Sequence, residues 1–125
     1  MKSLLDLLPK PAPMRALSRV YDLKTRLDWG EPALTIIDVR DRASFNHIHV
    51  RGAISMPMAK LVGLAEVSLE YDRDIYVYSD VDEEAIASAS QLRSAGFQNV
   101  SVLRGGAAAW KAAGFPVEAT SASAA

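Results

Sequence analysis

The sequence predicts an α/β domain in which a mainly parallel sheet of about five strands is covered by helices on both faces. Short apolar runs rich in β-branched and aromatic residues alternate along the 125-residue chain with segments of helical periodicity. The short runs are apolar at nearly every position, which is typical of strands buried on both faces. Hydrophobic residues make up 50% of the chain and charged residues 23%, as expected for one globular core.

Three segments have the composition of buried strands, and a fourth has it in weaker form. They span residues 34–39, 74–78 and 99–103, with the fourth at residues 53–56. Helical segments separate most of these strands, so we expect parallel pairing through crossover helices.

The first helix is expected after Ser18, which can act as its N-cap. Val20, Leu23 and Leu27 then fall on one face, and the helix should end near Gly30.

A later helix is indicated by the apolar stripe of Ala85, Ala89 and Leu92. Two helices should end in the same Ala-Gly-Phe sequence, at residues 95–97 and 113–115, with the glycine just past the last turn. We expect Trp29 and Trp110 to be packing residues.

The chain divides into a body and two terminal segments. Residues 1–13 form an amphipathic arm and a proline-rich linker, which could dock on the body, mediate a homo-dimer or fray. Residues 14–118 form the domain. Residues 119–125 are small and polar and are expected to be disordered.

Composition excludes several classes of function. The net charge is −1, which provides no excess of positive charge for nucleic acid or an anionic membrane. No stretch is long and apolar enough to span a bilayer, and Asp6 interrupts the apolar run near the N-terminus, so we expect a cytoplasmic protein. The chain has no cysteine, which excludes disulfides, thiolate metal sites and cysteine nucleophiles. No cofactor is indicated.

Several motifs together resemble the signature of rhodanese-like domains. They occur in the family's order and cover about residues 14–117: IDVR at 37–40, Phe45, HV at 49–50, GAI at 52–54, Pro57, AGF at 95–97, RGG at 104–106 and Trp110. Two positions depart from the family pattern, because Ile48 replaces a usual glycine and Arg51 replaces a frequent proline. The resemblance implies a rhodanese-like fold and a relationship to sulfurtransferases.

The resemblance also places the family's catalytic loop, of the form C-x-x-G-x-R, directly after the strand at residues 74–78. Ser79 then stands at the nucleophile position, Asp82 at the glycine position and Glu84 at the arginine position. The segment Ser79-Asp80-Val81-Asp82-Glu83-Glu84 therefore keeps the length of the loop without its thiol or its cation. A serine hydroxyl forms no persulfide, and four carboxylates repel an incoming anion.

The acidic segment has two interpretations. Ser79 or Asp80 can cap the following helix with Asp82 or Glu83 as the reciprocal residue, in which case the acids serve the helix N-terminus. Alternatively, the segment is a recognition surface for a basic partner or a divalent cation, although it lacks the glycine and distant glutamate of a calcium loop.

Charged and histidine residues in the preceding loop are the other candidates. Asp38, Arg40 and Arg42 lie at the mouth of the expected site, where the arginines could bind an acidic group or neutralise nearby carboxylates. His49 occupies a structural position of the family, and with His47 it provides only two possible metal ligands, so no metal site is predicted.

We therefore expect a non-catalytic rhodanese-like domain that binds or regulates another protein. The alternatives are an enzyme acting at residues 79–84, either serine-based or related to sulfurtransferases, and a structural module that dimerises through residues 1–13. A serine-based enzyme would require a base close to Ser79.

Overall fold

The computed structural model describes residues 14–30 and 33–120. The predicted arm at residues 1–13 and most of the predicted tail lie outside this part of the chain. The described chain continues to Thr120, whose backbone amide donates to the carbonyl oxygen of Asn46 at 2.8 Å.

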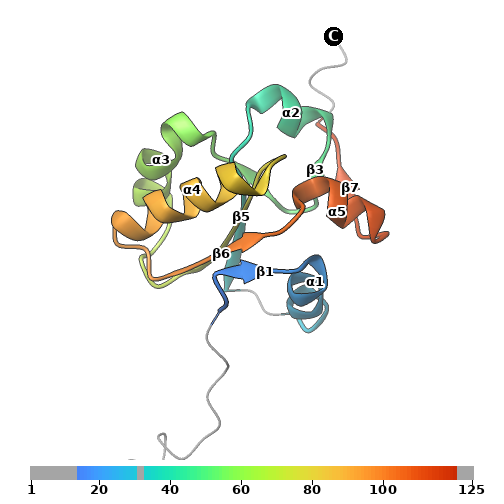
Figure 1. The fold of residues 1–125 in the computed structure, drawn as a ribbon, viewed down its shortest axis with the longest axis horizontal. Helices are drawn as coiled ribbons and strands as arrows, with labels where there is room; N and C mark the ends of the chain where they lie inside the picture. The colour runs from blue at the N-terminus through green and yellow to red at the C-terminus, as the bar shows by residue number, and fades with distance from the viewer. Residues whose placement is uncertain (1–13, 31–32, 121–125) are drawn as a thin grey trace, which may run out of the picture.

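Five parallel strands form the central sheet in the order β1-β6-β5-β2-β4 (Figure 1). A separate antiparallel pair joins β3 to β7. In chain order the elements are β1 Leu17–Ser18, α1 Val20–Asp28, β2 Leu34–Asp38, α2 Arg42–His47, β3 His49–Val50, β4 Ile54–Ser55, a 3-10 turn Met58–Lys60, α3 Leu61–Ser68, β5 Asp74–Tyr78, α4 Asp82–Ser94, β6 Asn99–Leu103, α5 Gly106–Ala112 and β7 Val117–Glu118. The predicted α/β class with about five mainly parallel strands is confirmed.

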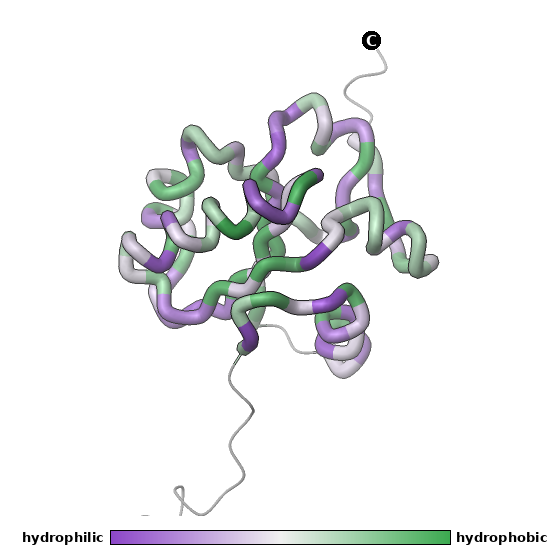
Figure 2. Tube along the Cα trace, in the orientation of Figure 1, coloured by the Kyte–Doolittle hydropathy of each residue, from purple (hydrophilic) through white to green (hydrophobic). Residues whose placement is uncertain are grey.

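Helices cover both faces of the sheet because alternate strand residues point to opposite sides. In β5, Ile75 and Val77 pack in one buried cluster with residues of α3 and α4. Tyr76 and Tyr78 pack in a second cluster with residues of α1 and α5. The hydrophobic strands accordingly run through the middle of the molecule (Figure 2).

The start of α1 differs from the prediction. Ser18 is not the N-cap, because it belongs to β1, pairs with Leu103 of β6 and shares a buried hydrogen bond with the hydroxyl of Ser101. Arg19 precedes the helix instead, and its backbone amide donates to the carboxylate of Asp22 at 2.9 Å. A two-residue edge strand carries too little pattern to be predicted from composition.

The two tryptophans also have different environments. Trp110 is buried, as predicted, and its indole N–H donates to the carbonyl oxygen of Pro116. Trp29 is 81% exposed at the end of α1, so the prediction that it packs in the core is wrong. Apolar residue type alone did not distinguish the inner face of α1 from its last residue.

Candidate functional site

The candidate site lies where parallel strands β2, β5 and β6 end. Asp38 ends β2 and Tyr78 ends β5, and these two residues are directly paired in the register. The acidic loop, residues 79–84, leaves β5 at this edge, and Gly105 follows β6 at the same edge. The carboxyl edge of a parallel sheet is the usual place for a ligand site in such folds.

Ser79 is turned into the protein rather than towards solvent. The residue is 1% exposed, and its Oγ donates a hydrogen bond of 2.8 Å to Glu84 Oε2. The backbone carbonyl of Glu84 in turn accepts a hydrogen bond from the hydroxyl of Ser88, one turn further along α4. The hydroxyl therefore has a carboxylate partner within its own loop.

Asp82 connects the loop to the start of α5. Its Oδ1 accepts a hydrogen bond of 2.9 Å from the backbone amide of Gly105. We call this contact the Asp82–Gly105 clasp. It joins the first residue of α4 to the residue that precedes α5.

The N-cap of α4 differs from the predicted capping box. The cap residue is Val81, in extended conformation, and it provides no side-chain hydrogen bond. Neither Ser79 nor Asp80 caps the helix. Asp82, Glu83 and Glu84 nevertheless occupy the first turn, where negative charge is favoured by the helix dipole.

Two glycines allow α5 to begin against the loop. Gly105 has a φ of 76° and Gly106 a φ of 56°, a region that residues with a Cβ rarely adopt. A Cβ on Gly106 would lie less than 3.0 Å from the carbonyl oxygen of Ser79 and 3.2 Å from Tyr78 Cδ2. The α5 backbone thus lies directly against the loop.

An ion pair closes the other side of the site. Asp38 is fully buried, and Arg40, whose side chain is 8% exposed, donates to both of its carboxylate oxygens. Arg40 also donates to the carbonyl oxygen of Ile48 at 2.6 Å and to Asp80 Oδ1 at 3.2 Å. Of the two predicted roles of Arg40, neutralisation of nearby carboxylates is the one observed.

Tyr78 belongs to the same network. Its hydroxyl oxygen accepts a hydrogen bond from the amide of Val50 at 3.0 Å. Burial raises the pKa of Tyr78 well above its ordinary value, and the negative charge of Asp38 raises it further. The phenol is therefore neutral and acts as a fixed structural group.

Ile48 shows why the departure from the family glycine is tolerated. Its φ is −162°, which is extended backbone that a β-branched residue adopts readily, and its carbonyl is the acceptor for Arg40. The site therefore keeps its backbone geometry at this position without a glycine.

The remaining predicted residues lie apart from the loop. Arg42 is exposed on α2, and its guanidinium lies 5.8 Å from the ring centre of Phe45. His49 is buried, its Nδ1 forms a 2.7 Å hydrogen bond with the carbonyl oxygen of Phe45, and its ring stacks on Phe45, which confirms the structural role. Within residues 14–30 and 33–120, no group of three or more potential side-chain ligands could hold a metal ion.

Several partners in the site were missed in the sequence. Glu84 follows Ser79 by five residues, a spacing that belongs to no regular helix or strand contact. Gly105 was recognised only as part of a motif, although the glycine pair after a strand indicated a close backbone approach. The Oγ of Ser55 is buried without a hydrogen-bond partner in the described chain, beside Asp38 in the strand register, and no sequence signal indicated this.

Comparison with known proteins identifies the family. The sequence matches the model of the rhodanese-like domain over residues 20–113. The chain belongs to the rhodanese-like family. In the part of this rhodanese-like chain that is described, no helix is long and apolar enough to cross a membrane.

Solved structures and curated relatives agree with this assignment. The crystal structure of the Alr3790 protein from Anabaena sp. is 54% identical, with a TM-score of 0.82, over 85% of this chain and 95% of that one. The thiosulfate sulfurtransferase GlpE of Coxiella burnetii is 34% identical over 83 residues, which are 63% of this chain and 73% of that protein. This rhodanese-like domain is therefore related to sulfurtransferases.

A further relative is longer than the match. The Synechocystis protein slr1261 is 30% identical over 90 residues, which are 72% of this chain but 50% of that protein. The chain thus spans about half the length of this relative.

Proposed function

We propose that this chain is a non-catalytic rhodanese-like module that binds or regulates a protein partner through the acidic loop. The observation that carries the proposal is the state of Ser79, whose buried hydroxyl donates to the Glu84 carboxylate. In this proposal Ser79 occupies the nucleophile position of the family.

Sulfur transfer requires a thiolate that accepts the sulfur as a persulfide. The 125 residues contain no cysteine, so the chain can supply no thiolate of its own. An incoming anion would also meet Asp80, Glu83 and Glu84, and each carboxylate at close range would repel it by about 1–4 kcal/mol. Both effects oppose sulfurtransferase chemistry at the loop.

A serine-based enzyme is the second candidate, and one observation favours it. Glu84 Oε2 accepts from Ser79 Oγ at 2.8 Å, so a base is within reach of the hydroxyl. Two features weigh against this candidate. Ser79 is almost inaccessible to a substrate, and a carboxylate of ordinary basicity is poorly matched to removing a hydroxyl proton.

The sulfur-transfer assay tests the catalytic part of the proposal. Wild-type protein, incubated with thiosulfate and cyanide, should produce no thiocyanate above a buffer blank. A fluorophosphonate probe, which labels activated serines, should leave Ser79 unmodified under native conditions. Thiocyanate production by pure protein, or Ser79 labelling that is lost in Glu84→Gln, would overturn the non-catalytic assignment.

The surface that supports partner binding is the outward side of the loop. Asp80 has a side chain that is 71% exposed, and Val81 and Glu83 are also exposed. Asp82 and Glu84 are engaged inside the domain by Gly105 and Ser79. The outward acids can therefore be changed without breaking the internal contacts of the loop.

A pair of double variants tests recognition by the loop. Affinity capture with Asp80→Ala/Glu83→Ala should lose a partner that wild type retains. The matched control, Glu66→Ala/Glu70→Ala, removes two exposed acids elsewhere and should retain it. Equal capture by all three proteins would contradict recognition by the loop.

Two further parts of the proposal concern the chain as a whole. We place the protein in the cytoplasm on the basis of its sequence, and cell fractionation tests this. We also propose that residues 1–13 support a homo-dimer, which measurement of the solution mass tests.

A further inference from the structure

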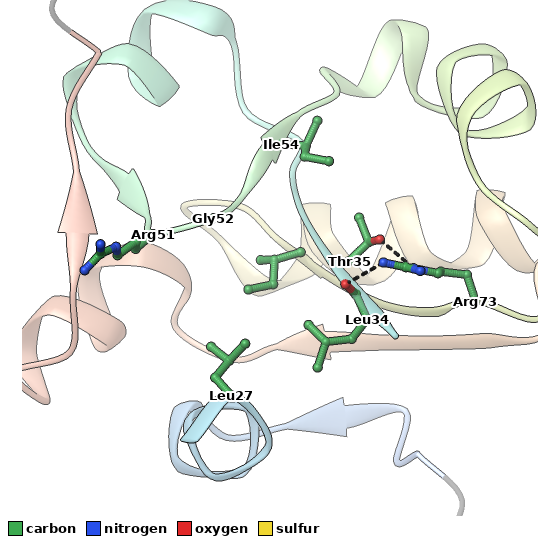
Figure 3. A pocket seen from close by; sticks show the side chains of 8 residues that line it. Leu27, Leu34, Thr35, Arg51, Gly52, Ile54 and Arg73 are labelled. Carbon is green, nitrogen blue, oxygen red and sulfur yellow. Dashed lines mark hydrogen bonds between the residues drawn. The ribbon is translucent and has the colours of Figure 1, made fainter. Parts of the chain in front are cut away.

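Two adjoining hollows form one groove on the face of the molecule that carries α1. Their volumes are about 320 Å³ and about 260 Å³, and they share Leu27 of α1 and Arg51. The larger hollow also contains Leu34 and Ile36 of β2 and Ile54 of β4 (Figure 3). We call the combined feature the α1–β4 groove.

The groove exists because β4 is short. β4 pairs only with Ile37 and Asp38, so no described strand lies beside the first three residues of β2 on this side. The apolar side chains at this edge are consequently not fully covered, and Ile54 remains 46% exposed. An edge of this kind attracts an apolar segment from another chain.

The polar groups of the groove are mainly cationic. Arg73 is held by hydrogen bonds to the hydroxyl of Thr35 and the carbonyl oxygen of Leu34, and Lys24 pairs with Asp28. Arg51 lies in both hollows, and its side chain is 71% exposed.

The only ion pair of Arg51 among the described residues is long. The carboxylate of Glu118 lies 4.0 Å away, and the same oxygen accepts the backbone amide of Gly52 at 3.2 Å. An apolar groove centred on such a cation fits a segment in which apolar side chains flank one carboxylate.

This chain contains such a segment. Residues 4–8 are Leu-Leu-Asp-Leu-Leu, with Asp6 at the centre. They lie outside the described part of the chain, so their contribution here is their sequence. We propose that the α1–β4 groove binds residues 4–8 of a second copy of this chain, with Asp6 paired to Arg51.

The sheet order favours a second copy over the same copy. β1, which follows Met14 closely, and β4 are the two outer strands, so about four strand spacings of about 4.8 Å, or about 19 Å, separate them. The six residue steps from Leu8 to Met14 span at most about 20 Å. A chain reaching its own groove would have no slack.

Reciprocal exchange of the segments gives a two-fold symmetric dimer with two identical contacts. The groove is separate from residues 79–84. The inference can therefore fail while the proposed function stands, and the reverse also holds.

Charge reversal in the full-length chain tests the pairing. Solution mass at increasing concentration should show a monomer–dimer equilibrium for wild type. Asp6→Arg and Arg51→Glu should each lower the dimerisation constant by about tenfold or more, because each acts at both contacts. The combined variant restores opposite charges and should recover most of the loss, whereas Lys60→Glu, a control at an exposed lysine outside the groove, should change nothing.

A spin label tests the location. The chain has no cysteine, so Ser3→Cys provides a single attachment site for a nitroxide beside residues 4–8. Spin-labelled unenriched protein is mixed with unlabelled ¹⁵N-enriched protein. The amide signals of Arg51, Gly52 and Ile54 should broaden in the mixture, and Arg51→Glu in the enriched chain should abolish the effect.

Three results would overturn the inference. These are a wild type that stays monomeric at all concentrations, broadening that is absent from the groove in the mixed sample, and a combined variant that dimerises no better than the single variants.

Discussion

Substitution of Gly106 by alanine should loosen the contact between α5 and the acidic loop at a cost that the structure allows us to calculate. The φ of 56° costs a residue with a Cβ about 1–2 kcal/mol. The new Cβ also overlaps the carbonyl oxygen of Ser79, a backbone atom that moves only with the loop. Overlap of this kind typically costs about 1–3 kcal/mol, so we expect a total loss of about 2–5 kcal/mol.

Gly114→Ala is the matched control because it isolates the backbone term. Gly114 has a φ of 82°, and its added Cβ would meet no atom within 4 Å. We therefore expect about 1–2 kcal/mol for this variant. The difference between the two variants measures the overlap with Ser79.

Urea unfolding followed by circular dichroism is the assay. With a slope of about 1–3 kcal/mol per molar, Gly106→Ala should lower the midpoint by about 1–2 M and Gly114→Ala by less than about 1 M. Equal shifts in the two variants would refute the close approach of α5 to the loop.

The other predictions concern the groups of the site. In Ser79→Cys the neighbouring Glu84 carboxylate should raise the thiol pKa above the free value of about 8.5, measured as the pH dependence of alkylation; a lower pKa, or no fall on adding Glu84→Gln, would contradict this. Asp38→Asn leaves buried Arg40 without its main partner and should cost about 3–5 kcal/mol in urea unfolding, against less than about 1 kcal/mol for the exposed control Asp80→Asn. Because the pKa of Tyr78 is raised on folding, its contribution to stability is complete below the unfolded value of about 10 and is lost as pH rises above it; Tyr78→Phe should show a shallower alkaline loss, and an identical slope would count against this. Calorimetric titration should detect thiosulfate binding to a folded loop graft but not to wild type, and a folded graft without binding would remove the assignment of residues 79–84 to the family's anion site; the graft is Ser79→Cys, Asp80→Arg, Val81→Ser, Asp82→Gly and Glu84→Arg.

The central sheet was predictable because its strands carry their own signal. The segments at residues 34–39, 74–78 and 99–103 are apolar at almost every position, and the structure places β2, β5 and β6 there. β1, β3 and β7 have two residues each, and their pairing depends on segments far away in the sequence. Composition within a short window contains no information about such partners.

The site was predictable in its position but not in its contacts. The motifs identified the loop after β5 and the buried role of His49. Capping rules gave the wrong N-cap for α4, because Asp82 bonds to Gly105, a residue 23 positions away, and Ser79 bonds to Glu84. Tertiary partners decided the geometry where local rules offered equivalent alternatives.

The Asp82–Gly105 clasp also provides a built-in reporter of the loop. The backbone amide of Gly105 lies in an exposed residue, where an unbonded amide exchanges rapidly with deuterium. While the Asp82 carboxylate holds this amide, its exchange is slowed, and each opening of the loop releases it. The isotope uptake at a single glycine thus counts the openings of a loop that contains no probe of its own, in wild-type protein and without a label.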